Sequence, residues 1–456
     1  MGKKMKKMKN ENKILALVEM AIVICSLFLV ALPAIAAEQT LQKASASKVT
    51  TASEDDFVLG IYGNANEDDT IDMRDLTYVK LIFFGERSET ELADAKYDDE
   101  INPLDFVQIK LIIVGKEKEL TLLQYMGYPP DFTEKAVTVP MPIERIVVVS
   151  SYAAEAVCAF GTQDRIVGVA DYTKNIGELN VFLKDKPSVG KGCCRDWDIE
   201  KIIELKPDIV LAFSFKSFPN LEEPLNAADI PLVQVDIYQT KKYSREIRNL
   251  GWLMDNKDRA EELIHFEQRH IDLIKERVDD LKPEEKTRVY YCSHAGYYGL
   301  PTHTSGKSTA KQTDIELCGG INIFDDLEGH YEVVDSEAVI IRNPQVIFAD
   351  TWCGAATGAL GYDITDTSSV EKVRTKTIMN YPGFDHIDAV KNGRVYFVSS
   401  DASSTHHCIW LSYMAKYFYP VLFEDVDPVE IHREWLETFL GIKYRGVYAY
   451  PTYPVS

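Results

Sequence analysis

Apolar residues recur at helical spacing along the stretch from Asp255 to Leu281. They are Ala260, Leu263, Ile264, Ile271, Ile274, Val278 and Leu281. This spacing predicts one long amphipathic helix, with Asp255 placed to cap its first turn and Pro283 placed to end it. At a rise of ~1.5 Å per residue the helix would be roughly 40 Å long, which is enough to join two separate lobes.

Short apolar runs alternate with helical patterns on both sides of this helix. Before it, strands are predicted at 144–150, 165–170, 207–213 and 230–235, with helices at 153–160 and 197–205. After it, strands are predicted at 288–291, 346–349 and 394–398, with helices at 310–318, 336–341 and 408–419. Such alternation is typical of parallel sheets. The predicted fold class is α/β, with two parallel-sheet lobes joined by one long interlobe helix.

The same patterns set the expected domain boundaries. The N-terminal lobe is predicted at 142–254, the interlobe helix at 255–281 and the C-terminal lobe at 286–420. The last stretch, 421–456, is rich in aromatic residues and is expected to pack on the C-terminal lobe rather than to form another domain.

The amino terminus has the pattern of a secretory signal peptide. Six lysines precede an apolar run from Ile14 to Ile35, and Ala34-Ile35-Ala36 is a small-x-small cleavage pattern. The expected signal peptide is 1–36, followed by a polar linker at 37–56; a retained membrane anchor is the alternative. Removal of six lysines and two glutamates would take the formal net charge from −21 to about −25. Such acidity argues against nucleic acid or an anionic membrane surface as a partner.

Two copies of an acidic repeat, 64–85 and 94–115, follow the linker at an offset of 30 residues. Each copy is a twelve-residue loop that runs into an amphipathic helix, so a small α module resembling EF-hands is expected before the lobes. Oxygen ligands at alternate loop positions can wrap one Ca²⁺. In the first loop these are Asn64, Asn66, Asp68, Asp72, Asp75 and the carbonyl of Thr70.

The second loop carries a weaker version of the same pattern. Its candidate ligands are Asp94, Asp98, Asn102, Asp105 and the carbonyl of Glu100. Lys96 replaces a ligand at the third position, so lower affinity is expected there. The alternative is that both loops are acidic surface turns that bind nothing.

The tandem arrangement of loops resembles a type I dockerin over residues 57–115. That resemblance implies a module folded by calcium that docks on a cohesin-type receptor at the cell surface. Lys96 and the aspartates at the position usually held by glycine, Asp69 and Asp99, depart from the pattern. Residues 116–141 are expected to be a connector to the lobes.

Ligands of parallel sheets bind at the carboxyl ends of the strands, and those ends here carry aromatic and short polar residues. Aromatic and polar groups together suit a large, partly planar ligand. The candidate binding residues are Ser151, Tyr152, Tyr172, Trp197, Phe215, Lys216, His294, Trp352 and His407.

Motifs that would indicate an enzyme are missing from the sequence: it has no GxSxG, HExxH or complete P-loop. Cysteine and histidine residues raise a different possibility, a soft-metal site built from both lobes. The residues concerned are Cys193, Cys194, Cys353, His406, His407 and Cys408. A disulfide across the mouth of the cleft or buried thiols are the alternatives.

Four blocks, 143–172, 188–213, 304–327 and 389–401, resemble the cluster A (class III) solute-binding proteins of ABC importers. The resemblance covers about 142–420. It implies binding without catalysis, a ferric siderophore, haem or cobalamin as cargo, and a single interlobe helix. In that family one glutamate on each lobe pairs with arginines of the permease, and the matching positions here are Glu200 and Glu337.

The leading hypothesis is therefore an extracytoplasmic protein that delivers an iron complex or cobalamin to an ABC permease. A cell-surface interaction protein that uses its calcium module is the alternative, and a secreted enzyme carried by a dockerin is a third. An acidic siderophore would need basic partners, for which Lys174, Lys191, Arg195 and Lys216 are candidates. A corrinoid would instead contact Tyr152, Tyr172, Trp197 and Trp352.

Overall fold

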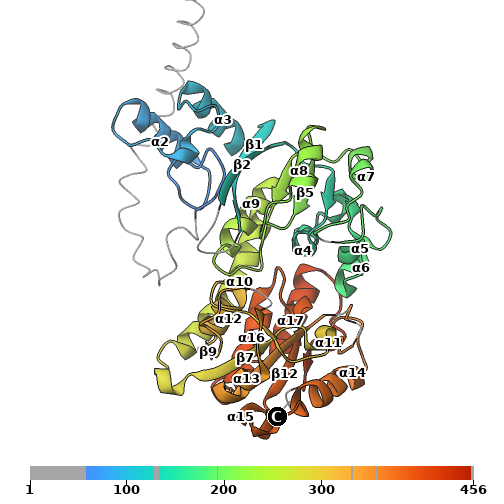
Figure 1. Ribbon diagram of the computed structural model, residues 1–456. Coiled ribbons are helices and arrows are strands. Elements are labelled where there is room, and N and C mark those ends of the chain that lie inside the picture. Colours follow the sequence, from blue (N-terminus) through green and yellow to red (C-terminus); the bar gives the residue numbers. More distant parts are fainter. Residues whose placement is uncertain are drawn as a thin grey trace, which may run out of the picture.

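The computed structural model describes residues 58–127, 133–192, 194–329, 332–352, 354–355 and 357–452. The predicted signal peptide and linker lie outside these residues. Within the described ranges, no helix combines the length and the apolar composition needed to cross a membrane. A small module, the N-terminal lobe and the C-terminal lobe follow one another along the chain (Figure 1).

The N-terminal lobe is built on a four-stranded parallel sheet in the order β4-β3-β5-β6. Its strands are β3 (Ile146–Val148), β4 (Ile166–Val169), β5 (Ile209–Ala212) and β6 (Leu232–Gln234). Its helices are α4 (Ser151–Ala159), α5 (Asp171–Lys174), α6 (Gly177–Leu183), α7 (Ile199–Glu204), α8 (Pro219–Asn226) and α9 (Tyr243–Leu253). β3 and β5 are buried along their whole length, as expected for apolar strands covered on both faces.

The C-terminal lobe contains a five-stranded sheet in the order β13-β12-β11-β7-β9. Its strands are β7 (Thr287–Cys292), β9 (Gly320–Asn322), β11 (Val346–Thr351), β12 (Val395–Ser399) and β13 (Ala449–Tyr450). Only β13, from the C-terminal extension, is antiparallel to its neighbour. A separate two-stranded ribbon pairs β8 (His303–Thr304) with β10 (Glu332–Val333).

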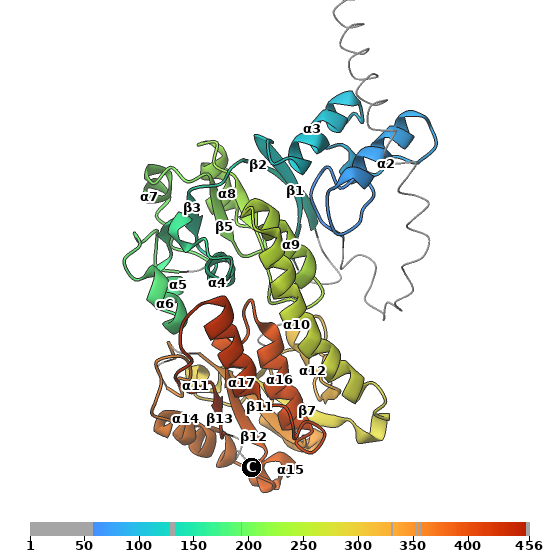
Figure 2. The ribbon, with the colours of Figure 1, turned by 180° about the vertical axis from the view of Figure 1, so that it is seen from behind.

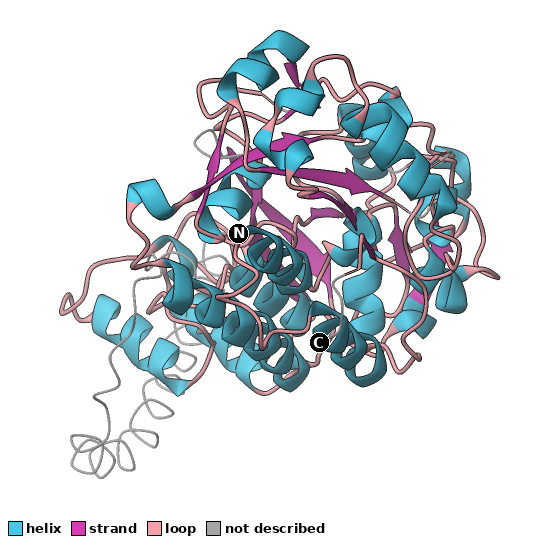
Figure 3. Cartoon of the chain, turned by 90° about the horizontal axis from the view of Figure 1, so that it is seen from below, coloured by secondary structure: helices cyan, strands magenta, loops and turns pink. Residues whose placement is uncertain are grey.

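Helices surround the strands of this lobe, as Figure 3 shows from below. They are α11 (Ala295–Tyr298), α12 (Ala310–Leu317), α13 (Ser336–Arg342), α14 (Ser368–Lys372), α15 (Asp388–Lys391), α16 (His407–Phe418) and α17 (Pro428–Glu434). The α/β fold with two parallel-sheet lobes is thus confirmed.

The long helix α10 (Lys257–Val278) runs from the N-terminal lobe along the C-terminal lobe, packing on α9 and α16 (Figure 2). The prediction that Asp255 caps it is wrong, because Asp255 is left-handed at φ 52° and the N-cap residue is Asn256. The side chain of Asn256 donates to the carbonyl of Phe160 instead of capping the helix. The helix start is therefore tied to α4 of the N-terminal lobe rather than to its own first turn.

The repeat forms α2 (Met73–Phe83) and α3 (Pro103–Ile113), but the expected connector is itself ordered structure. β1 (Glu119–Met126) and β2 (Thr133–Pro140) pair along their whole length as an antiparallel hairpin. Ile61 of the module bridges to Leu122 of this hairpin, and the Gln124 amide oxygen accepts from the backbone N–H of Gln234 in β6 at 2.8 Å. The module is thus joined to the N-terminal lobe through the hairpin.

A buried hydrogen bond adds a direct contact between the module and the lobe. The backbone N–H of Gly60 donates to the Asn249 amide oxygen in α9 at 3.1 Å. A side chain at Gly60 would force Arg245 to move, because a Cβ there would lie 2.7 Å from its Nε atom. One continuous apolar core includes Ile61 and Val79 of the module together with Ile247 of α9. The module therefore packs as part of the N-terminal lobe and is not a separate domain attached by a linker.

Candidate functional site between the lobes

Aromatic side chains gather at the carboxyl ends of β3 and β5 in the N-terminal lobe. Tyr152, in the first turn of α4, lies with its ring 5.3 Å from Phe213 and 5.0 Å from Tyr238 between centroids. Phe215 continues the cluster to Phe218 at 5.7 Å. These contacts form an aromatic wall from Tyr152 to Phe218.

Trp197 and Lys216, two further predicted binding residues, lie against the same wall. The Trp197 ring meets Phe218 edge to face at 5.3 Å. The Lys216 ammonium lies 5.5 Å from the Phe215 ring centre and 5.4 Å from that of Phe218. Lys216 therefore extends the wall with a cation held over aromatic faces.

The C-terminal lobe has a second aromatic cluster, organised by His294 at the end of β7. The His294 Nδ1 atom lies 2.6 Å from Oδ2 of Asp350, and its backbone N–H donates to Oδ1 of Asp350 at 2.7 Å. Burial disfavours the charged imidazole, but the charge of Asp350 and its hydrogen bond outweigh it and raise the pKa of His294. His294 also has a left-handed backbone at φ 47°, which turns the chain sharply at the strand end.

Trp352 and Tyr298 contact the His294 ring, and Tyr297 continues the cluster. The His294 ring lies 5.0 Å from Trp352, which in turn lies 5.8 Å from Tyr297. Tyr298 stacks on His303 at 3.6 Å. Tyr297 is 65% exposed, so this cluster is accessible. Both lobes thus present aromatic rings at the carboxyl ends of their parallel strands.

A small cavity lies between the lobes next to Tyr152. Its N-terminal-lobe residues are Ser151, Tyr152, Glu155, Tyr172, Ile176, Glu178 and Leu179, and its C-terminal-lobe residues are Ser400, Asp401 and Ser404. Three predicted binding residues, Ser151, Tyr152 and Tyr172, therefore meet at one cavity. Glu178 and Asp401 were missed, because an acidic residue at the start of a helix usually lies on a solvated surface and only the tertiary fold brings these two together.

His407 was expected in the binding site, but its ring is fully buried at the junction of α16 and α12. Its Nε2 atom lies 2.7 Å from Oδ1 of Asp314, and its Nδ1 atom lies 2.8 Å from the Ser403 hydroxyl. With both ring nitrogens occupied inside the lobe, His407 is placed to hold α16 against α12 rather than to meet cargo. Sequence alone gives no sign of this burial.

Among the described residues, the members of the predicted cysteine and histidine group do not form one cluster. His406 contacts Glu155, whereas His407 contacts Asp314. Cys408 is a buried free thiol, while Cys193 and Cys353 lie outside the described residues. Across the described part of the chain, no cluster of three or more His, Cys, Asp or Glu side chains is arranged to hold a metal.

The lobes are linked by the buried carboxylate of Glu155, another residue that the sequence did not single out. One of its oxygens, Oε1, lies 2.8 Å from Nδ1 of His406 and accepts from Nε1 of Trp435 at 2.9 Å. The other, Oε2, accepts from the backbone N–H of Thr405 at 3.3 Å. Glu155 belongs to the N-terminal lobe and its partners to the C-terminal lobe and its extension, so this group is a second connection beside α10.

The basic candidates for an acidic ligand do not converge. Lys174 donates to the carbonyl of Lys186 at 2.8 Å and lies 3.8 Å from Asp171. Lys191 and Arg195 are exposed, and Lys216 lies over its aromatic neighbours. Of the four candidates, only Lys216 belongs to the aromatic wall.

The two candidate contacts with a permease lie on different lobes. Glu200 is in the first turn of α7 and Glu337 in the first turn of α13, and both are exposed. Each follows an aspartate that caps its helix, Asp198 or Asp335. The similar helix starts explain how two separate exposed carboxylates recur in the two halves of the chain.

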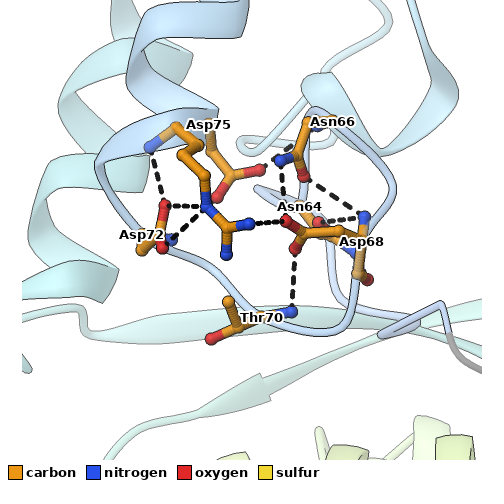
Figure 4. A network of polar contacts seen from close by, with 7 residues as sticks. Asn64, Asn66, Asp68, Thr70, Asp72 and Asp75 are labelled. Atoms are coloured by element: carbon orange, nitrogen blue, oxygen red, sulfur yellow. Dashed lines mark hydrogen bonds and ion pairs between the residues drawn. The ribbon is translucent and has the colours of Figure 1, made fainter. Parts of the chain in front are cut away.

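The first repeat loop brings its candidate calcium ligands together around an internal cation (Figure 4). Arg74 Nη1 lies 2.9 Å from Asp68, and Arg74 Nε lies 3.0 Å from Asp72. Asp75 is buried and accepts from the backbone N–H groups of Asn66 and Asp72. Burial raises the pKa of Asp75 to about 6, with the nearby charges of Asp68 and Asp72 acting in the same direction.

The remaining candidates of the first loop bond to the loop itself. The amide oxygens of Asn64 and Asn66 both accept from the Asp68 backbone N–H, and Asp68 accepts from that of Thr70. The loop therefore has the right donor types, but a calcium ion would have to displace Arg74 from Asp68 and Asp72.

The second loop lacks such an internal partner in the described contacts. Lys96 turns away to Glu119, and position 11, where the first loop has Arg74, is Leu104. Asp94 and Asp98 lie near enough to Asp105 to raise its pKa, after burial, which is the larger cause. Asn102 caps α3, and its side chain donates to the Glu100 carbonyl. The expectation that this loop is the weaker one overlooked Arg74.

Two lobes of parallel sheet, joined by one long helix and lined with side chains at the strand ends, define the architecture of a solute-binding protein. Residues 146–402, more than half of the chain, match the periplasmic binding protein family, and the chain belongs to that family. Membership implies a place outside the cytoplasm and a permease partner. The family and its structural neighbours are solute-binding proteins rather than enzymes.

Curated relatives extend over the same region. The vitamin B12-binding protein of Vibrio cholerae serotype O1 is 29% identical over 224 residues, which are 46% of this chain and 71% of the relative. That of Yersinia pestis is 25% identical over 209 residues, covering 45% of this chain and 68% of the relative.

Solved structures share the two-lobed fold. The TroA-like periplasmic binding protein FepB of Veillonella parvula matches with a TM-score of 0.59 and 21% identity, covering 71% of this chain and 98% of that chain. MolA of Haemophilus influenzae, bound to molybdate, matches with a TM-score of 0.56 and 19% identity, covering 71% and 99%. At these identities the likeness establishes the fold alone.

Replacing Glu155 with alanine should destabilise the protein by about 3–5 kcal/mol, because it leaves the buried partners His406 and Trp435 unmatched. Burial opposes ionisation of Glu155, but His406 and the hydrogen bonds hold its pKa below the ordinary value. The stabilisation is thus present at neutral pH and lost as pH falls through that lowered pKa. Urea unfolding measures the change. Glu204→Ala, which removes an exposed partner of Lys201, is the control and should lose at most about 1 kcal/mol; equal losses would contradict the assignment.

Proposed function

We propose that the chain binds a corrinoid between its lobes and delivers it to an ABC importer. The observation that carries this proposal is the pair of aromatic clusters at the strand ends of the two lobes, around Tyr152 and around Trp352. A corrin ring is large and flat and has an apolar face, so rings and short polar groups on both sides match it. The relatives named as vitamin B12-binding proteins support the same cargo.

An iron complex, whether a siderophore or haem, is the alternative cargo. A polyanionic ferric siderophore needs converging basic groups, and the four basic candidates do not converge. The cavity next to Tyr152 instead has the acidic residues Glu155, Glu178 and Asp401 in its wall. None of the described residues that line this cavity is basic, so it offers no opposite charge to an anionic complex and favours a neutral or cationic one.

Cyanocobalamin should quench the tryptophan fluorescence of the full chain. Trp352→Ala should weaken binding roughly tenfold, or about 1.4 kcal/mol, because it removes an aromatic contact with the ring. Tyr97→Ala, in the repeat module, is the control because Tyr97 is a half-exposed aromatic outside both lobes. Haem and a ferric siderophore are titrated in parallel. Saturable binding of either one, with no response to cyanocobalamin, would replace the corrinoid by an iron complex.

The contact with the permease is assigned to Glu200 and Glu337. Exposed carboxylates add little to folding, but against permease arginines each would contribute on the order of 1–3 kcal/mol as a charge-assisted contact. One contact per lobe also fixes how the protein sits on its partner.

The double variant Glu200→Ala with Glu337→Ala should keep its melting temperature and its cargo affinity. It should bind the cognate permease in detergent or nanodiscs at least tenfold more weakly at low salt, as measured by surface plasmon resonance. Added salt should weaken the wild-type complex in the same direction by screening these contacts. Exposed Glu204→Ala with Glu223→Ala is the matched control. Normal permease binding by the first double variant at low salt would show that the assignment is wrong.

The repeat module is proposed to bind calcium and to attach the protein to the cell surface. The second loop is favoured as the cation site because its sequence has three carboxylates of the ligand pattern, Asp94, Asp98 and Asp105, and because Lys96 is engaged with Glu119. The module also leaves apolar side chains of α2, α3 and their ends exposed, including Phe84 at 66%, Leu104 at 58% and Val114 at 53%. Exposed apolar side chains of this kind suit docking on a cohesin-like receptor.

Calorimetry of the EDTA-treated full chain should detect calcium binding with the second loop filled first. Asp105→Asn should remove that event, whereas Arg74→Ala should strengthen binding at the first loop by freeing Asp68 and Asp72. Affinity at the first loop should fall as pH drops through about 6, because Asp75 then takes up a proton. A wild-type chain that gives no heat with millimolar calcium, alone and as Arg74→Ala, would exclude calcium as the module's ligand.

A further inference from the structure

The cavity between the lobes contains an acid whose surroundings do not satisfy it. Glu178, in the first turn of α6, is 2% exposed, and among the described residues its Oε2 atom has no hydrogen-bond partner. Asp401, on the opposite lobe, lines the same cavity. An ionised carboxylate buried in this way is costly unless a cation or hydrogen bonds match it.

The groups around Glu178 are mostly acidic or already engaged. Asp401, Glu155 and Asp363 each oppose its ionisation. Two basic side chains of the described residues near it are engaged with other acids, since His406 contacts Glu155 and Arg445 contacts Asp363. The other titratable side chains close to it are tyrosines: Tyr152, Tyr172, Tyr362 and Tyr448. Burial first, and these negative charges second, hold the pKa of Glu178 well above its ordinary value.

Close packing keeps Glu178 at the lobe boundary. Gly177 precedes it, and a Cβ at Gly177 would lie 2.8 Å from the Cβ of Tyr362 in the C-terminal lobe. The start of α6 therefore touches the opposite lobe directly. Parting of the lobes would admit water to this cavity and allow the carboxyl group to ionise, and closure would exclude the water.

We propose that Glu178 is a positioning residue that makes cargo binding proton-linked: the lobes close around cargo with this carboxyl protonated, and rising pH favours opening and release. The inference rests on the proposed function only in that cargo closes the lobes. Geometry carries it, because the unmatched oxygen and the opposing acid belong to different lobes and share one cavity.

The direction of the effect follows from linkage. A carboxyl group that is harder to ionise in the closed form takes up a proton on closure. Closure is therefore fully favoured below the ordinary pKa of a glutamate and becomes weaker as pH rises toward the higher value of the closed form. One proton limits the change to about tenfold in affinity per pH unit.

The experiment is a fluorescence titration with cyanocobalamin, whose own charge is constant in this range, from pH 5 to pH 8. Wild-type affinity should fall at least tenfold overall. Glu178→Gln, which has the same shape but cannot ionise, should change less than about twofold, and exposed Glu223→Gln should follow the wild type. A Glu178→Gln variant that keeps the wild-type slope, or a wild type without a slope, would overturn the proposal.

Two further measurements keep the test decisive. Wild-type calorimetry in buffers of different ionisation enthalpy should detect proton uptake on binding near neutral pH. Binding without proton uptake would contradict the proposed role of Glu178. Asp401→Asn should reduce the pH dependence of cargo affinity, because it removes a charge that opposes ionisation of Glu178. An unchanged pH dependence would contradict the proposed coupling of Asp401 to Glu178. These two measurements do not require Glu178→Gln to fold.

If cyanocobalamin does not bind at any pH, the corrinoid assignment is wrong, but the buried state of the Glu178 carboxyl group can still be tested without cargo. The melting temperature of Glu178→Gln minus that of the wild type should then increase from pH 5 to pH 8, because only the wild type has a buried carboxyl that ionisation destabilises. A difference in melting temperature that does not depend on pH would overturn the proposed role of Glu178, whatever the cargo is.

Discussion

The arrangement of the two lobes depends on one buried charge. The Glu155 carboxylate has lost its water, and it is stable only because His406, Trp435 and the backbone of Thr405 surround it. Those partners belong to the C-terminal lobe and its extension. The requirement to match this charge therefore fixes α4 against the start of α16 and explains why the extension reaches beyond its own lobe.

This link and α10 together determine how the binding site can work. Arg259 of α10 donates to the carbonyls of Thr438 and Phe439, so the extension also holds the interlobe helix. With two rigid connections, large rotations of the lobes are restricted and small changes at their boundary gain importance. A single carboxyl such as Glu178 can then influence closure, because little else has to move.

Much of the fold could be predicted from the sequence. The buried apolar runs that became β3, β5 and β11, and the periodic stretch that became α10, are local patterns with a direct physical meaning. The hairpin of β1 and β2 was missed, because its strands gain their burial from the module and from β6. Asp255 was read as a cap, but the left-handed turn that places it outside the helix depends on the approach of α9 to α10.

The site was less accessible to prediction than the fold. Strand ends identified Tyr152, Tyr172 and Trp352, because parallel sheets place those ends at one edge. His407 was assigned to the same region, although Asp314 and Ser403 hold it inside the lobe. Glu155 and Glu178 gave no signal, since the distances that make them important are between lobes. Asp401 follows a predicted strand but was not selected as a binding residue. In the repeat, the residue that changes the picture is Arg74, a loop position that ligand spacing ignores.

The fused module has a geometric consequence for a protein that works between two partners. The hairpin of β1 and β2 and the bond from Gly60 to Asn249 leave no swivel between the module and the N-terminal lobe. A receptor bound to the exposed side chains of α2 and α3 would therefore also fix the orientation of the lobes. That orientation determines the side from which Glu200 and Glu337 meet a permease. The surface of the module and the surface that carries Glu200 and Glu337 therefore have to reach their two partners in a single orientation of the protein.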